Sequence, residues 1–303
     1  MSAQELESLV TMLRSGGPDL AGPPQQAREN FEAMFAAFPI AADVTFEPTT
    51  LGGVPARWSN TPGASKERVL FYLHGGGYVL GSSLAYRSLF SELARAAGAR
   101  GLALDYRLAP ENPFPAAVDD AVSGYRALLS QGIAPGSIAI AGDSAGGGLT
   151  VAMLVAARDA GLPMPAAAIA ISPWVDMEGT GGTMSSKAAD DPSLNREVML
   201  GMASAYLNGA SPRAPLASPL YANLAGLPPL LIQVGSLEVL LDDATRLAAR
   251  AGKSDVPVQL EIWPRMPHVW HGFASMLSEG RDAIAAAGAF VTARFQKRQE
   301  ASA

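Results

Sequence analysis

Short apolar runs alternate with helical stretches along most of the chain, and this alternation restricts the possible folds more than any other feature. The runs that predict strands are Val69–Leu73, Arg100–Asp105, Ile138–Ala141, Ala166–Ile171, Leu230–Val234 and Val258–Trp263. The stretches that predict helices are Val118–Leu129, Ala145–Ala160, Arg196–Leu207, Asp242–Ala251 and Arg281–Phe295. Gly161 and Gly252 stand where two of these helices should stop. Such alternation predicts an α/β fold with a mostly parallel sheet that helices cover on both faces.

Two segments depart from the alternation, and we expect both to lie over the sheet. We predict N-terminal cap helices in residues 1–45 and the main domain in residues 46–303, with a cap insertion at about residues 179–222. The insertion begins with the loop-like stretch "GTGGTMSSKAADDPS" and ends in a stretch dense in turn residues. The alternative is a long surface loop together with an N-terminal arm.

An aromatic stripe marks the N-terminal segment. Phe31, Met34, Phe35 and Phe38 recur at helical spacing, and Pro39 should close that helix. The stripe either packs across the mouth of a site or buries the arm against the body. Short strand signals follow in "ADVTFEP" and "VPARWSN", joined through Gly52 and Gly53.

Composition excludes several classes of protein. The 303 residues carry a net charge of −6 and no basic cluster, so a nucleic-acid partner is not expected. The start "MSAQELESLV" lacks the pattern of a secretion signal, and no apolar run reaches membrane-spanning length. These features predict a soluble, cytoplasmic protein. The absence of cysteine excludes a disulfide scaffold and a thiol nucleophile.

The stretch "GDSAGGG" stands between a predicted strand and a predicted helix, which is the context of a nucleophile elbow. Such a turn exposes the hydroxyl of Ser144 above the sheet, and Gly142 and Gly146 leave room for neighbouring backbone. The N-terminus of the following helix offers free N–H groups to a developing oxyanion. A phosphate-binding loop is the alternative, but no nucleotide-binding glycine motif occurs.

A serine hydroxyl needs a base, and the base needs an orienting acid. His268 and His271 follow the last predicted strand, whereas His74 begins "HGGGYVLG" and is expected to be structural. We predict His268 as the base because it comes first after its strand. A metal site on "HVWH" is the alternative for that pair, and it lacks a third ligand. We therefore expect no metal.

Three acids, Glu238, Asp242 and Asp243, follow the strand that precedes this pair of histidines. The order serine, acid, histidine is that of α/β hydrolases. Glu238 lies four residues after Val234, in the loop where the acid must reach the histidine. Asp242 stands where the next helix starts and is expected to be its N-cap, with Asp243 in the first turn.

The motifs "HGGGYVLGS", "LDYRLAPENPFPAAVDDA", "GDSAGG", "ISPWVDM" and "MPHVWHGF" together resemble the hormone-sensitive lipase family of α/β hydrolases, bacterial esterase branch, over about residues 44–297. The resemblance implies an eight-stranded α/β-hydrolase sheet with a helical lid, and esterase activity on short to medium acyl chains without a cofactor. It implies a homodimer and a small-molecule ester as substrate.

The resemblance also implies the residues of the site. It gives Ser144, Glu238 and His268 as the catalytic residues, and the backbone N–H groups of Gly76, Gly77 and Ala145 as the oxyanion hole. The acid segment departs from the family's usual D-P-L-x-D, because it reads E-V-L-L-D. The alternative function is that of a non-hydrolytic relative, such as a dehydratase or a small-molecule binding protein.

Overall fold

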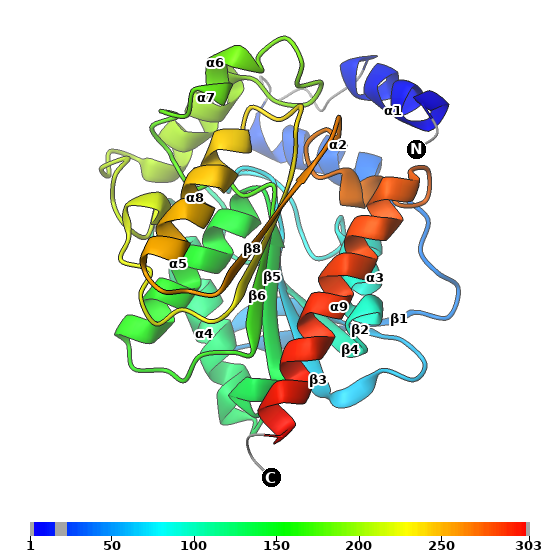
Figure 1. Ribbon diagram of the computed structural model, residues 1–303, viewed down its shortest axis with the longest axis vertical. Helices are drawn as coiled ribbons and strands as arrows, with labels where there is room; N and C mark the ends of the chain where they lie inside the picture. Colours follow the sequence, from blue (N-terminus) through cyan, green and yellow to red (C-terminus); the bar gives the residue numbers. More distant parts are fainter. Residues whose placement is uncertain (1–2, 16–22, 301–303) are drawn as a thin grey trace.

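The sheet confirms the α/β architecture. The computed structural model describes residues 3–15 and 23–300. Within these ranges one sheet of eight strands runs in the order β1-β2-β4-β3-β5-β6-β7-β8 (Figure 1). The strands are β1 (Thr45–Leu51), β2 (Val54–Asn60), β3 (Ser65–Leu73), β4 (Ala99–Leu104), β5 (Ile138–Asp143), β6 (Ala167–Ile171), β7 (Leu230–Gly235) and β8 (Val258–Trp263). β1 and β2 run antiparallel to their neighbours, and β4, β3, β5, β6, β7 and β8 are mutually parallel.

Helices cover both faces of the sheet, and β3 shows why its stretch Val69–Leu73 is apolar throughout. Val69, Phe71 and Leu73 pack toward the face covered by α4 (Ala116–Ser130), α5 (Ala145–Asp159) and α8 (Leu241–Lys253). Leu70 and Tyr72 pack toward the other face, which α3 (Arg87–Ala96) and α9 (Ser278–Glu300) cover (Figure 1). A parallel strand buried on both faces reads as a continuous apolar run rather than an alternating one.

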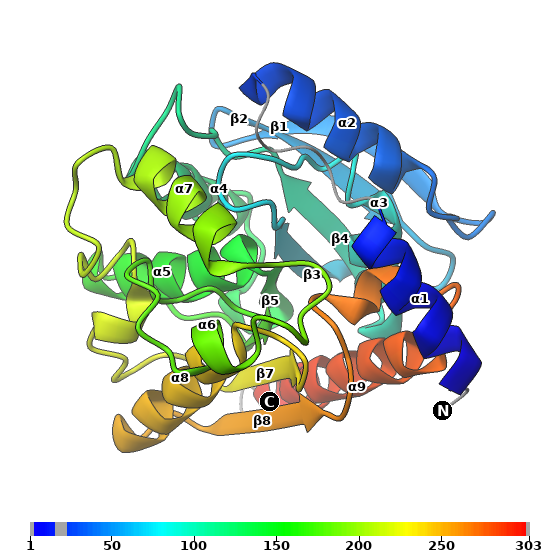
Figure 2. The same cartoon turned by 90° about the horizontal axis from the view of Figure 1, so that it is seen from above.

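The segments outside the alternation lie over the carboxyl ends of the parallel strands, as Figure 2 shows for α1 (Ala3–Ser15), α2 (Pro24–Ala36), α6 (Thr183–Ser186) and α7 (Arg196–Leu207). The insertion is more than a surface loop, because Met184, Met199 and Tyr206 are buried in the main core. α6 is a helix that the sequence pattern did not predict. The division into cap and main domain stays a prediction.

The N-terminal stripe has three members, not four. The rings of Phe31 and Phe35 stack with their centroids 4.3 Å apart, and Phe38 packs edge-on against Phe273. Met34 is exposed, so its expected place in the stripe is wrong. At about 100° per residue, position 34 falls at the edge of the face that carries the three rings, where its side chain is exposed. The helix also ends at Ala36, before Pro39.

The observed boundaries of α8 differ from the predicted ones. The helix runs from Leu241 to Lys253, so Gly252 lies inside it and does not stop it. Its N-cap is Leu240, and Asp242 is therefore not the expected cap but stands within the first turn. By contrast, Gly161 follows α5 with a φ of +70°, which confirms the predicted stop.

Gly288 generates a stability prediction, because a Cβ at this position of α9 would lie 2.4 Å from the carbonyl oxygen of Ala96. We expect Gly288→Ala to lower the melting temperature, although alanine is favoured in helices by about 1 kcal/mol. Gly201 in α7 is the control, because a Cβ there has nothing within 4 Å, and Gly201→Ala should maintain or raise the melting temperature. Circular dichroism melts measure both, and a stabilised Gly288→Ala would contradict the close packing of α9 on α3.

Candidate active site

Ser144 stands on a strained turn between β5 and α5. Its φ and ψ are 53° and −120°, which few residues other than glycine adopt. A Cβ on Gly146 would lie 2.0 Å from the carbonyl oxygen of Leu73, and one on Gly142 would lie 2.2 Å from that of Gly146. The expectation that both glycines make room for backbone is confirmed. The geometry is that of a nucleophile elbow.

The glycine loop after β3 folds tightly beside this turn. Gly76 has a φ of +107°, and its carbonyl accepts the N–H of Leu80 at 2.8 Å. Asp143 holds the start of the loop, because its Oδ1 accepts the N–H of Gly75 at 2.9 Å. Within the described part of the chain, no carbonyl or side chain accepts the backbone N–H of Gly76, Gly77 or Ala145. These three N–H groups are therefore available to an anion.

The N-terminal helix α2 anchors the far end of this loop. Arg28 donates from Nε to the carbonyl of Val79 at 2.9 Å and from a terminal nitrogen to that of Ala109 at 2.8 Å. Its guanidinium also pairs with Glu111. α2 thus contacts the body through both its aromatic rings and this arginine.

A direct hydrogen bond joins His268 to Glu238, with 2.8 Å between Nδ1 and Oε2. The side chain of Glu238 has no exposed surface, and its Oε1 accepts from the N–H of Gly235 at 2.6 Å and the hydroxyl of Ser172 at 2.7 Å. Burial raises the pKa of Glu238, while these donors favour its charged form. Nδ1 of His268 therefore carries the proton, which leaves Nε2 with a free lone pair.

The electrostatics of this pair favour a strong base. Burial opposes the positive charge of His268, but the hydrogen bond and the negative charge of Glu238 outweigh it. The pKa of His268 is consequently raised above its ordinary 6.5.

His271 makes a different contact, 2.9 Å from its Nε2 to Oε1 of Gln233. The amide nitrogen of Gln233 donates to Glu261 and to the carbonyl of Ala283, which fixes the amide with its oxygen toward His271. Nε2 of His271 must therefore be the donor. Burial lowers the pKa of His271 to about 3, so the ring is neutral.

His74 lies beneath the glycine loop. The ring is buried, it stacks on Tyr106 with centroids 4.2 Å apart, and its Nδ1 bonds the carbonyl of Gly75 at 2.7 Å. Burial lowers its pKa. The ring therefore supports the loop from below.

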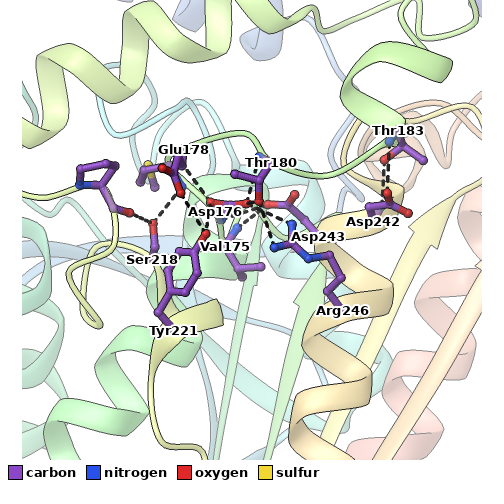
Figure 3. Close-up of polar contacts among 12 residues, drawn as sticks. Val175, Asp176, Glu178, Thr180, Thr183, Ser218, Tyr221, Asp242, Asp243 and Arg246 are labelled. Carbon is purple, nitrogen blue, oxygen red and sulfur yellow. Dashed lines mark hydrogen bonds and ion pairs between the residues drawn. The ribbon is translucent and has the colours of Figure 1, made fainter.

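Asp242 bonds the insertion rather than a histidine (Figure 3). Its Oδ2 accepts the N–H of Thr183 at 3.1 Å, and its own N–H donates to the Thr183 hydroxyl at 2.9 Å. Of the three acids that follow β7, Glu238 makes the contact to His268.

A second polar cluster joins the start of the insertion to α8 (Figure 3). Asp176, whose side chain is fully buried, accepts from Thr180 and pairs with Arg246 at 3.0 Å. Asp243 beside it accepts the N–H groups of Val175 and Asp176 at 2.9 and 3.0 Å. Burial raises the pKa of Asp243 to about 8. Asp243 is thus a neutral acid next to a charged one at neutral pH.

Sequence reasoning missed Ser172, whose hydroxyl donates to Glu238 and accepts the N–H of Val269 at 3.2 Å. The only signal was its place in "ISPW" at the end of a strand.

Among the described residues, no cluster of three His, Asp or Glu side chains could hold a metal ion. No helix in the same ranges is long and apolar enough to span a membrane.

Comparison with known proteins identifies the class of protein to which this chain belongs. Residues 70–272 match the family defined by the α/β hydrolase fold. An acetyl-hydrolase of Streptomyces hygroscopicus is 47% identical over 291 residues, covering 96% of this chain and 97% of the relative. An esterase of Acinetobacter venetianus is 34% identical and covers 89% of each. The fold and the site define an α/β hydrolase.

Solved structures narrow the class to a family. An esterase from the bacterial hormone-sensitive lipase family has a TM-score of 0.94 at 49% identity, covering 97% of this chain and 99% of that chain. A second relative, EstE5, was crystallised and soaked with p-nitrophenyl butyrate, and it has a TM-score of 0.93 at 48% identity, covering 97% of this chain and 100% of that chain. The chain belongs to the bacterial hormone-sensitive lipase family, and it is a carboxylic ester hydrolase.

The raised pKa of Asp243 generates a prediction about stability and pH. The folded protein holds this proton up to about pH 8, whereas the unfolded chain releases it near 3.8. The group's contribution to the free energy of unfolding is therefore full below 3.8 and is lost as the pH rises to about 8. Asparagine cannot ionise, so Asp243→Asn should show a shallower fall in melting temperature between about pH 5 and 9.

The exposed Asp190 provides the control for this titration, and Asp190→Asn should keep the parental slope. Equal slopes for the parent and Asp243→Asn would contradict the neutral buried acid.

Proposed function

We propose that this esterase cleaves short- to medium-chain acyl esters through an acyl-serine intermediate. Ser144 is the nucleophile, His268 the general base and Glu238 the orienting acid. The observation that carries the proposal is the 2.8 Å bond between Nδ1 of His268 and a fully buried Glu238. It fixes the tautomer that leaves Nε2 ready to accept the serine proton.

The reaction then follows from the site. As the Ser144 oxygen attacks the ester carbonyl, its proton passes to Nε2 of His268, and the Glu238 carboxylate stabilises the imidazolium. The negative charge that develops on the carbonyl oxygen is stabilised by the free N–H groups of Gly76, Gly77 and Ala145. The imidazolium protonates the departing alcohol, and a water activated by His268 hydrolyses the acyl-enzyme.

The acyl preference rests on the resemblance, and no cofactor takes part in the proposed steps. We expect higher specificity constants for acetate to hexanoate nitrophenyl esters than for palmitate. Stronger turnover of palmitate would contradict this part of the proposal. The homodimer and the cytoplasmic location stay predictions.

Replacing the nucleophile tests the covalent route. Ser144→Ala should lower kcat by several orders of magnitude, because only oxyanion stabilisation and binding remain. Circular dichroism should show an unchanged fold, since the hydroxyl is not part of the core. Near-parental hydrolysis of p-nitrophenyl acetate by this variant would overturn the assignment.

The two neighbouring histidines should respond in opposite ways. His268→Ala should be nearly inactive. His271→Ala should keep most of kcat but lose about 1–3 kcal/mol of stability, because Gln233 loses a buried partner. In the parent, activity should rise with pH through a pKa above 6.5, since the base must be neutral. An active His268→Ala beside an inactive His271→Ala would show that the base is misassigned.

Replacing each of two carboxylates by its amide tests which acid orients His268. Glu238→Gln should cost roughly 10³–10⁴-fold in kcat, because the amide no longer favours the correct tautomer. Asp242→Asn should retain most of kcat. It should lose about 1 kcal/mol of stability, because its hydrogen bond to Thr183 is weakened. Ester kinetics and thermal melts separate them, and the opposite ranking of the two kcat values would identify Asp242 as the acid.

A further inference from the structure

The turn that carries Glu238 is held by the insertion as well as by the sheet. Leu241 donates to the carbonyl of Glu238 at 3.2 Å, which places Val239 and Leu240 at the centre of a tight turn. The N–H of Val239 donates to Oδ2 of Asp191 at 2.9 Å. The carbonyl of Val239 accepts the hydroxyl of Thr183 at 2.8 Å. Both backbone groups of this one residue are thus bonded to side chains of the insertion.

The carboxylate of Asp191 is fixed in the orientation in which it bonds that turn. Its side chain is buried, and its other oxygen, Oδ1, accepts the N–H groups of Ser193 and Leu194 at 2.9 and 3.0 Å. These two bonds fix the carboxylate within its own loop and leave Oδ2 aimed at Val239. Thr183, which also bonds Asp242, ties the same turn to α6 (Figure 3).

The departure from the usual acid segment makes the contact possible. A proline in the position of Val239, as in D-P-L-x-D, has no N–H to donate. The sequence E-V-L-L-D supplies this donor directly after the acid. The N–H that this unusual segment provides therefore has the buried carboxylate of Asp191, in the insertion, as its acceptor.

The negative charge of Asp191 also acts on the base. Three carboxylates act on the charge of His268, those of Glu238, Asp191 and Asp143, and the neighbouring ring of His271 is neutral. Burial lowers the pKa of His268, and after Glu238 the negative charge of Asp191 is the next cause that raises it. The same side chain thus contacts the turn of the acid and supports the charge of the base.

We propose that Asp191 is a positioning residue for the Glu238–His268 pair, acting from the insertion through the N–H of Val239. The inference rests on the proposed function of that pair. It gives the insertion a role in assembling the catalytic acid, in addition to covering the sheet.

Two variants with one control test the proposal. Asp191→Ala removes the acceptor and its charge. Val239→Pro removes the donor and keeps the charge of Asp191, at a turn position that favours proline, although it also replaces the buried Val239 side chain. Each should lower kcat for p-nitrophenyl acetate by about 10–100-fold with little change in KM, as a displaced catalytic group does. Asp190→Ala alters an exposed neighbour that pairs with Lys187 on the surface, and it should match the parent.

A measurement without substrate keeps this inference separate from the proposed function. The chain has three histidines, so NMR titration can follow the His268 imidazole once His268→Asn identifies its signal. Asp191→Ala should lower the pKa of His268, because a nearby negative charge is lost, whereas Asp190→Ala should not. A purely structural role would lower the melting temperature but leave this pKa unchanged.

Parental values of kcat and of the His268 pKa in a folded Asp191→Ala would overturn the inference. If Asp191→Ala melts below the assay temperature, Val239→Pro decides, and parental kcat in that variant overturns the inference. If the parent hydrolyses no ester, the proposed function fails, and the NMR comparison still decides the role of Asp191.

Discussion

The hydrogen bonds of one buried carboxylate hold the loops of the candidate active site together. Removing an ionised side chain from water costs several kcal/mol unless the protein supplies donors. Glu238 finds them in Gly235 at the end of its own strand, in Ser172 after β6 and in His268 after β8. Three loops are thus fixed relative to one another by a single group, and His268 can take only one tautomer and one orientation.

A second constraint is the absence of side chains where β3, β5 and α5 meet. The backbone of Gly146 passes so close to the carbonyls of Leu73 and His74 that no Cβ fits between them. This contact places the first turn of α5 directly against the start of the glycine loop. The first turn of α5, which begins with Ala145, consequently lies beside the start of the loop that carries Gly76 and Gly77.

The sequence predicts the elements whose signals are local. Strands such as Val69–Leu73 and the turn around Ser144 are recognisable because periodicity and glycine spacing lie within a few residues. Met34 and Asp242 were misplaced because their environments depend on tertiary packing: one is exposed at the edge of the face that carries the rings, and the other bonds a helix 59 residues away in sequence. Ser172 and Asp191 were missed for the same reason, since neither contact leaves a pattern in the neighbouring sequence.

The central claim is that Ser144 is a nucleophile activated by His268, and covalent labelling tests it most directly. The protein is incubated with a fluorophosphonate, and the adduct is located by peptide mass spectrometry. The account predicts one adduct per chain, on Ser144, formed much more slowly in a folded His268→Ala variant. An adduct on another residue, or labelling of Ser144 at the parental rate without His268, would contradict it.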